Sequence, residues 1–169
     1  MKFFHADLDS LRKLYGDQLD HLYSMEAQIL EAFPQLVYRA SDTELKHALE
    51  NHFQQTKGHV ARLEQIMHEA RGKVESKKSK GMAALISEGE DLITDISDES
   101  VRDAAIIASA QKIEHYEIAA YGTARNFAQI LRHEDQAELL RQSLEEEKQA
   151  DATLTTIADR ANSRADKAA

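Results

Sequence analysis

The sequence predicts an all-α protein, an antiparallel four-helix bundle with a short extra helix in the crossover between helices 2 and 3. Four long stretches carry apolar residues at helical spacing, and alternating β-branched runs are missing. Pro occurs once and Gly six times in 169 residues, so few helix interiors are interrupted. Because 42% of the residues are hydrophobic, the chain can fill one sizeable core.

The first long helix is expected from about Asp7 to Tyr38. Pro34 lies inside its pattern and should kink or break the last turns, because proline removes one backbone hydrogen bond. Ser41 is a candidate N-cap for the second helix, with Glu44 at the capping-box position. These signals predict a helical hairpin with its turn near Ser41.

The remaining helices follow from their apolar periods and their start and stop residues. The second helix should cover about 42–70 and end at Gly72, followed by a polar connection over 73–81. A shorter helix over 82–96 is weakened by Gly89, and two more long helices should cover about 99–131 and 136–160. We therefore expect one bundle domain over 1–160 and a frayed tail over 161–169.

Charge and composition exclude several classes of protein. The net charge of −9 argues against general nucleic-acid binding, which needs a basic surface. The absence of Cys removes disulfides, zinc–cysteine sites and thiol nucleophiles. The first residues include Asp7 and Asp9 and no long apolar run, and no stretch is long enough to span a membrane, so we expect a cytoplasmic protein without a signal peptide.

Carboxylates interrupt the apolar stripes near the middle of three long helices. Glu26 falls on the buried side of the first helix, Glu114 and Glu117 on that of the third, and Glu147 and Asp151 on that of the fourth. The second helix has polar residues at the same place, namely His52, Gln55, Thr56 and His59. A buried carboxylate is costly unless it is paired or binds a metal, so these positions form a candidate site.

Counting from the turns places these residues at one level. Glu26 precedes Ser41 by 15 residues and Thr56 follows it by 15. Glu117 and Glu147 are likewise 15 residues on either side of Arg132. Equal counts from the turn of an antiparallel hairpin mean equal height. A shift of 91 residues also carries Glu26 onto Glu117, which suggests a weak internal repeat.

Carboxylates and imidazoles in the core of a helical bundle are typical ligands of a centre that holds two Fe or Mn ions. We expect Glu114 or Glu117 to bridge the ions, and Glu26 and Glu147 to act as terminal ligands. The full candidate ligand set is Glu26, Gln55, His59, Glu114, Glu117, Glu147 and Asp151. The usual Glu-x-x-His pair is absent, because Thr56 precedes His59 by three residues.

Each of these residues also has a structural interpretation. For His52, we favour a hydrogen-bonded histidine within the bundle over a metal ligand by about two to one. Glu146 flanks the buried face and could turn inward in place of Glu147, whereas Glu145 belongs to a solvated acidic run. The whole polar layer could be a hydrogen-bonded network that sets helix register.

Four segments, LYSMEAQILEAFPQL, HFQQTKGHVARLEQI, KIEHYEIAAYGTAR and LEEEKQADATL, resemble the YciF-like family of bacterial ferritin-like stress proteins. The resemblance covers nearly the whole chain and implies a ferritin-like four-helix bundle, a homodimer, a possible dimetal site and a role in stress. The family's Glu positions carry over onto Glu26, Glu114, Glu117 and Glu147, and its His onto His59. The family usually has Glu at position 54 or 55, where this chain has Gln at both.

Two functions remain open at this point. The first is a dimetal-binding stress protein that oxidises Fe(II) or reduces peroxide. The second is a non-enzymatic bundle that acts by dimerisation or partner binding, with a purely structural polar layer.

Overall fold

The structure is a computed structural model that describes residues 8–168, and every regular element within this range is helical. The predicted all-α class is confirmed, while the expected helix start at Asp7 lies outside the described residues. The helices are α1 (Leu11–Arg39), α2 (Thr43–Arg71), α3 (Lys80–Thr94), α4 (Glu99–Ile130) and α5 (Glu134–Ala165), followed by a 3₁₀ turn, η1 (Asp166–Ala168).

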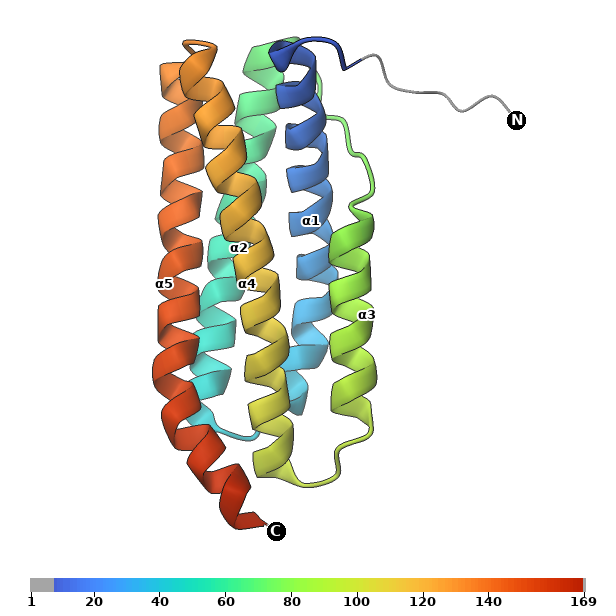
Figure 1. Ribbon diagram of the computed structural model, residues 1–169, viewed down its shortest axis with the longest axis vertical. Helices are drawn as coiled ribbons and strands as arrows, with labels where there is room; N and C mark the ends of the chain where they lie inside the picture. Colours follow the sequence, from blue (N-terminus) through green and yellow to red (C-terminus); the bar gives the residue numbers. More distant parts are fainter. Residues whose placement is uncertain (1–7, 169) are drawn as a thin grey trace, which may run out of the picture.

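Four long helices run side by side along the long axis, and α3 lies against them on one side (Figure 1). The α1–α2 and α4–α5 pairs are antiparallel hairpins. Between them, the connection after α2 and the descending α3 return the chain to the end where α2 began, so α4 runs parallel to α2. The predicted short helix in the crossover is therefore present and has a topological role.

The turn between α1 and α2 differs in detail from the prediction. α1 continues through Pro34 to Arg39, so the proline does not end the helix. Asp42, rather than Ser41, is the N-cap of α2, and its side chain accepts from the backbone N–H of Leu45. Ser41 instead donates its backbone N–H and its hydroxyl to the buried carboxylate of Asp103.

Glycines mark the end of α2 and a close approach of two helices. Gly72 caps α2 with a φ of 73°, in the left-handed region that glycine adopts without strain. Gly89 is buried where α3 meets α4, and a Cβ at this position would lie 3.1 Å from the Cβ of Ser109. Gly89 thus lowers helix propensity but allows α3 to pack tightly on α4.

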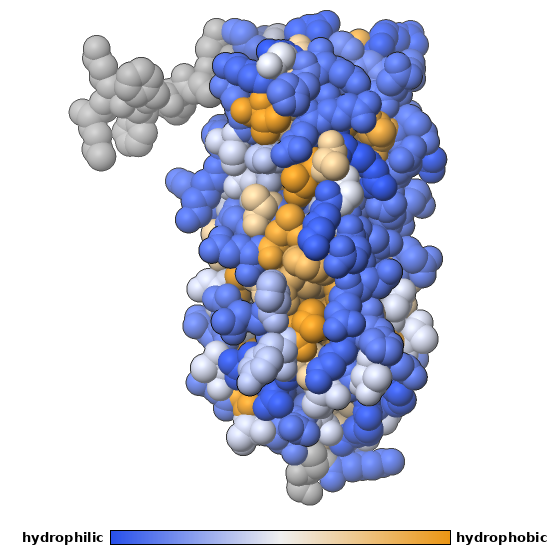
Figure 2. Space-filling view, turned by 180° about the vertical axis from the view of Figure 1, so that it is seen from behind, coloured by the Kyte–Doolittle hydropathy of each residue, from blue (hydrophilic) through white to orange (hydrophobic). Residues whose placement is uncertain are grey.

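The last long helix extends past its expected end near Arg160 to Ala165, and Ala161 is buried. Within residues 8–168, no helix combines the length and hydropathy that crossing a membrane requires. Seen from the side opposite to Figure 1, the surface is mostly hydrophilic, with an apolar strip along the long axis (Figure 2).

Candidate metal centre

Six ionisable side chains meet in the middle of the bundle and are almost completely removed from solvent. Each of the four long helices supplies at least one of them. They are Glu26 on α1, His52 and His59 on α2, Glu114 and Glu117 on α4, and Glu147 on α5, and none is more than 5% exposed. Each lies on the apolar side of its helix, so burial of the bundle core brings them together.

One group of possible metal ligands consists of His52, Glu114, Glu117 and Glu147. One ligand atom from each residue lies within 4.8 Å of all the others. The Nε2 atom of His52 is 3.3 Å from an oxygen of Glu114 and 3.3 Å from an oxygen of Glu147. These donor types at these separations suit a divalent transition metal.

A second group consists of Glu26, His59 and Glu147, with ligand atoms equally close. The Nδ1 atom of His59 lies 2.8 Å from Oε1 of Glu147 and 3.4 Å from Oε1 of Glu26. Glu147 therefore belongs to both groups. A carboxylate with one oxygen available to each group is the natural bridge between two sites.

The carboxylates of the two groups are largely without hydrogen-bond donors. Six of their eight oxygens are buried and unpartnered, one each on Glu26 and Glu114 and both on Glu117 and Glu147. Nδ1 of His59 is close to Glu147, but not in hydrogen-bond geometry. Buried polar atoms are almost always partnered in folded proteins, so this concentration needs an explanation. The donor set fits two cations, which would satisfy oxygens and charges together.

Burial and mutual repulsion shift the pKa values of these acids. Burial, together with the neighbouring carboxylates, raises the pKa values of Glu114 and Glu117 well above the ordinary range. Burial likewise raises the pKa of Glu26. For Glu147, burial is outweighed by His59 and His52, and its pKa is lowered. Burial and mutual repulsion therefore favour the uncharged forms of Glu26, Glu114 and Glu117 over the charged forms.

His59 is oriented from its outer side. Its Nε2 atom lies 2.8 Å from an oxygen of Glu146, which forms a two-pronged ion pair with Arg62 at 2.7 and 2.8 Å. Burial alone would lower the pKa of His59, but contacts with Glu147 and Glu26 raise it to about 10. A carboxylate that holds the outer nitrogen of a histidine directs the other nitrogen toward a metal.

Tyr121 closes the layer on one side. It is completely buried, and its hydroxyl donates to Oε1 of Glu26. Its ring lies edge-on to that of His59, with centroids 5.7 Å apart.

Two predicted ligands lie outside both groups. The side-chain oxygen of Gln55 is 3.3 Å from Nδ1 of His52, so Gln55 supports that histidine. Asp151 is half-buried, and its carboxylate accepts from Gln111 and lies 3.5 Å from His115. His52, interpreted mainly as a bundle histidine, belongs instead to the first group. The sequence offered one signal that His52 belongs to the site. It lies seven residues before His59, on the same buried face of the helix.

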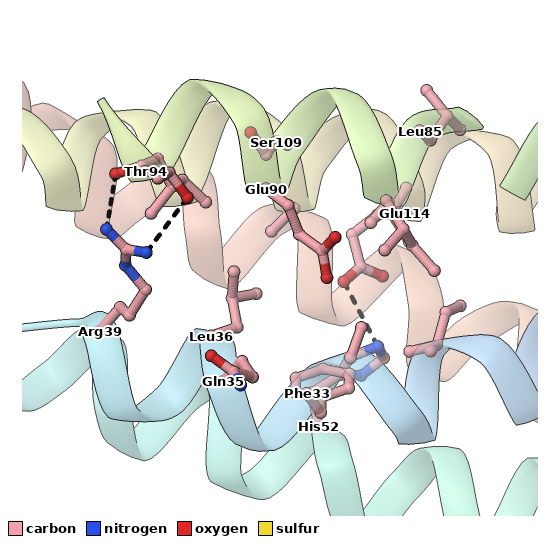
Figure 3. A pocket seen from close by; sticks show the side chains of 17 residues that line it. Phe33, Gln35, Leu36, Arg39, His52, Leu85, Glu90, Thr94, Ser109 and Glu114 are labelled. Carbon is pink, nitrogen blue, oxygen red and sulfur yellow. Dashed lines mark hydrogen bonds and ion pairs between the residues drawn. The ribbon is translucent and has the colours of Figure 1, made fainter. Parts of the chain in front are cut away.

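Two cavities reach the centre from different sides, and both are lined by His52 and Glu114. The larger, about 330 Å³, lies between α1, α3 and α4, and Figure 3 shows His52 and Glu114 joined across it. The smaller, about 60 Å³, opens between α2 and α5 past Asn51, Gln55 and Gln149. Its amide side chains form a polar approach to the buried acids.

Comparison with known proteins agrees with this fold. Escherichia coli YciF is 37% identical over 153 residues, which are 90% of this chain and 92% of that protein. The crystal structure of this E. coli stress protein matches with a TM-score of 0.88 at 36% identity, covering 92% and 99% of the two chains.

Two further structures extend the comparison. YcfI from Rhodopseudomonas palustris, for which a structural role has been suggested, has a TM-score of 0.88 at 35% identity, with 91% and 98% of the chains covered. A Xanthomonas campestris protein at 19% identity and a TM-score of 0.71, covering 93% and 99%, shares the fold alone. Residues 10–166 match the family described as a domain of unknown function, DUF892. The chain therefore belongs to the DUF892 family, as the resemblance to YciF-like proteins predicted.

Proposed function

We propose that this protein is a stress protein that holds two divalent Fe or Mn ions in the centre of its bundle. The observation that carries the proposal is the set of six buried carboxylate oxygens without a hydrogen-bond partner. Four of them, on Glu26, Glu114 and Glu117, also lack an ion pair among the described residues, whereas the two on Glu147 lie 2.8 and 3.3 Å from His59 and His52. A hydrogen-bonded structural network would supply donors to these oxygens, because each buried unsatisfied polar atom costs about 1–3 kcal/mol. Two cations remove this cost and the repulsion between the acids at once.

The ligand residues would form two neighbouring ion positions. Glu26 and His59 would hold one ion, and His52, Glu114 and Glu117 the other, with Glu147 shared. This arrangement favours Glu147 as the bridge, in place of the Glu114 or Glu117 expected from the sequence. Glu146 and Arg62 would keep Nδ1 of His59 directed inward. Two bound Fe(II) ions would supply the two electrons that reduce one molecule of peroxide to water, and would themselves be oxidised to Fe(III).

Metal analysis of the native protein tests the proposal directly. Protein purified aerobically with added Fe or Mn should retain about two ions per chain. Glu117→Gln, which keeps side-chain volume but removes a charge, should lower this number and weaken binding at the remaining position. Glu145→Gln, two residues before Glu147 on the exposed acidic run, is the matched control and should bind as the native protein does.

Two results would count against the proposal. One is less than one ion per chain in the native protein after purification with added metal. The other is equal loss of metal in Glu117→Gln and Glu145→Gln, which would indicate loose binding to surface acids. Anomalous diffraction from a crystal soaked in Mn(II) would then locate the ions, with peaks expected beside Glu147.

The rival proposal is a bundle that acts by dimerisation or partner binding. The apolar strip in Figure 2 favours it, because a long exposed apolar surface is typical of an interaction site. The two proposals are compatible, and we expect a homodimer in either case. Metal analysis of the dimer shows whether the polar layer is purely structural, since a purely structural layer predicts a dimer that binds neither Fe nor Mn. A cytoplasmic location stays a prediction.

A further inference from the structure

The larger cavity is a mainly apolar pocket that is partly open to solvent. It measures about 330 Å³ and lies between α1, α3 and α4. Its apolar walls come from all three helices and include Ile29, Phe33, Leu36, Leu85, Ile86 and Ile113. Figure 3 shows Arg39 and Thr94 at one end and His52 and Glu114 toward the other. Cavities of this size and lining are typical of small-molecule sites.

Polar contacts at both ends of α3 hold the cavity open. At its C-terminal end, the Arg39 side chain on α1 donates to the carbonyl oxygen of Ile93 at 3.0 Å and to the hydroxyl of Thr94 at 3.3 Å. At its N-terminal end, Ser79 donates its backbone N–H to the hydroxyl of Ser24, and its carbonyl oxygen accepts from Gln28. Because α3 is joined to α1 at both ends, the space between them is built into the fold.

The lining decides what kind of molecule fits. Apolar cavities of about 150 Å³ stay dry and bind apolar molecules such as benzene. A cavity of about 330 Å³ has room for about ten non-hydrogen atoms, since one water-sized group takes about 30 Å³. The side chains on its walls therefore favour an apolar chain or ring over a cluster of waters.

Glu114 determines which polar group the bound molecule can carry. It is 3% exposed and points into the cavity, and its Oε2 atom has no hydrogen-bond partner. A hydroxyl group can both donate and accept, so it matches this carboxyl group whether or not the carboxyl is protonated. Beside Glu114 an anionic group is disfavoured, because burial opposes a charge there and the exposed Glu90 also lines this space. Arg39 lines the opposite end of the cavity, where it donates to Ile93 and Thr94.

We propose that this cavity binds an uncharged, largely apolar alcohol of about ten non-hydrogen atoms, with its hydroxyl against Glu114. Glu114 and His52 also belong to the first ligand group, so the hydroxyl end of the molecule would lie beside the metal centre. The binding itself needs only the apolar walls and the carboxyl group. It can therefore be measured on the metal-free protein, separately from the proposed metal function.

The test uses 1-octanol and octanoate as probes of equal chain length and different charge. Titration of metal-free protein, followed by isotope-labelled isoleucine methyl signals in NMR, should show saturable shifts for Ile29, Ile86 and Ile113 with 1-octanol. Octanoate should bind at least ten-fold more weakly. Equal binding of the two probes, or no saturable shift with 1-octanol, would overturn the proposal.

Variants then locate the site. Ala32 lines the cavity, and Ala32→Phe should fill it and remove 1-octanol binding. Ala84→Phe adds the same ring at an exposed position of α3 outside the lining and should leave binding unchanged. If Ala32→Phe does not fold, as judged by circular dichroism, Ile86→Phe fills the cavity from α3. Binding that survives in a folded cavity-filling variant would contradict the proposal.

Discussion

Two buried groups of acids lie at different heights in this bundle and differ in how their oxygens are satisfied. Near the α1–α2 turn, all four carboxylate oxygens of Asp42 and Asp103 accept hydrogen bonds. In the centre, six of the eight oxygens of Glu26, Glu114, Glu117 and Glu147 accept none. Both groups are buried, so burial alone does not separate a structural group from a functional one.

The two groups differ in whether the protein supplies hydrogen-bond donors to their carboxylates. Asp103 accepts from the backbone N–H groups of Ser41 and Asp42 and from the Ser41 hydroxyl, all in a turn that would otherwise lack partners. The central acids face one another and two histidines. The group at the turn is therefore complete within the protein, whereas the oxygens of the central group are left for the cations that we propose.

Asp103→Ala should cost about 3 kcal/mol of unfolding free energy, because it leaves two backbone donors and a hydroxyl without their acceptor. Urea unfolding should show the same loss with and without added Mn(II). Asn126→Ala, at an exposed position of the same helix, should change stability by less than about 0.5 kcal/mol. A loss for Asp103→Ala that disappears on adding metal would mean that the two groups are not independent.

Glu146→Ala should weaken metal binding by about 10- to 100-fold, because Glu146 holds the outer nitrogen of His59. Competition with a chelator measures this affinity. Its neighbour Glu145 is exposed and pairs with Lys148, so Glu145→Ala should retain native affinity. Equal affinities in the two variants would show that the Arg62–Glu146–His59 arrangement does not orient a ligand.

A rise in pH should change the contributions of the two groups to protein stability in opposite directions. The pKa values of Glu114 and Glu117 are raised, so in the metal-free protein their favourable contribution is full below the ordinary value of 4.5 and is lost as pH rises. Burial raises the pKa of Asp42, but Arg164, the Leu45 backbone N–H and Arg160 lower it overall. Its contribution is therefore present above 3.8 and is lost as pH falls.

Thermal unfolding of the metal-free protein should thus show a melting temperature that falls from pH 5 to pH 8. Glu117→Gln should flatten this fall and raise the stability of the metal-free protein at pH 8 by about 1 kcal/mol, because an isosteric neutral group replaces a buried acid. Added Mn(II) should stabilise the native protein at pH 8 far more than the variant. A metal-free native protein that becomes more stable from pH 5 to pH 8 would contradict the assignment.

The sequence predicted the central group better than the group at the turn. Glu26, Glu117 and Glu147 interrupt apolar stripes at equal distance from the turns, so their helical period and the bundle geometry were enough to place them. Asp103 lies on the same stripe as Ile107, Ala110 and Glu114, and its burial could have been read from that spacing. Its partner could not, because Ser41 is 62 residues away and belongs to the other hairpin.

The finer assignments within the centre depended on side-chain directions that periodicity does not resolve. Glu146 and Glu147 are adjacent, and only the structure shows one facing inward and the other holding His59 from outside. Asp151 lies one turn beyond Glu147 on the same face, yet it contacts Gln111 and His115. A helical stripe is wide enough to include both core residues and flanking residues, so its margins stay ambiguous.

The smallest expected effect concerns Asp42, which caps α2 and also pairs with Arg160 and Arg164. Asp42→Ala should lower the unfolding free energy by about 1 kcal/mol through loss of the cap. Asp98→Ala removes the equivalent cap of α4, whose carboxylate accepts from Val101, and should cost about the same. Any additional loss in Asp42→Ala belongs to the arginine pairs and should vanish at 1 M salt, because both arginines are partly exposed and screened. An additional loss that persists at high salt would place part of the stability of the turn in the ion pairs, and the turn would then depend on charge pairing as well as on backbone donors.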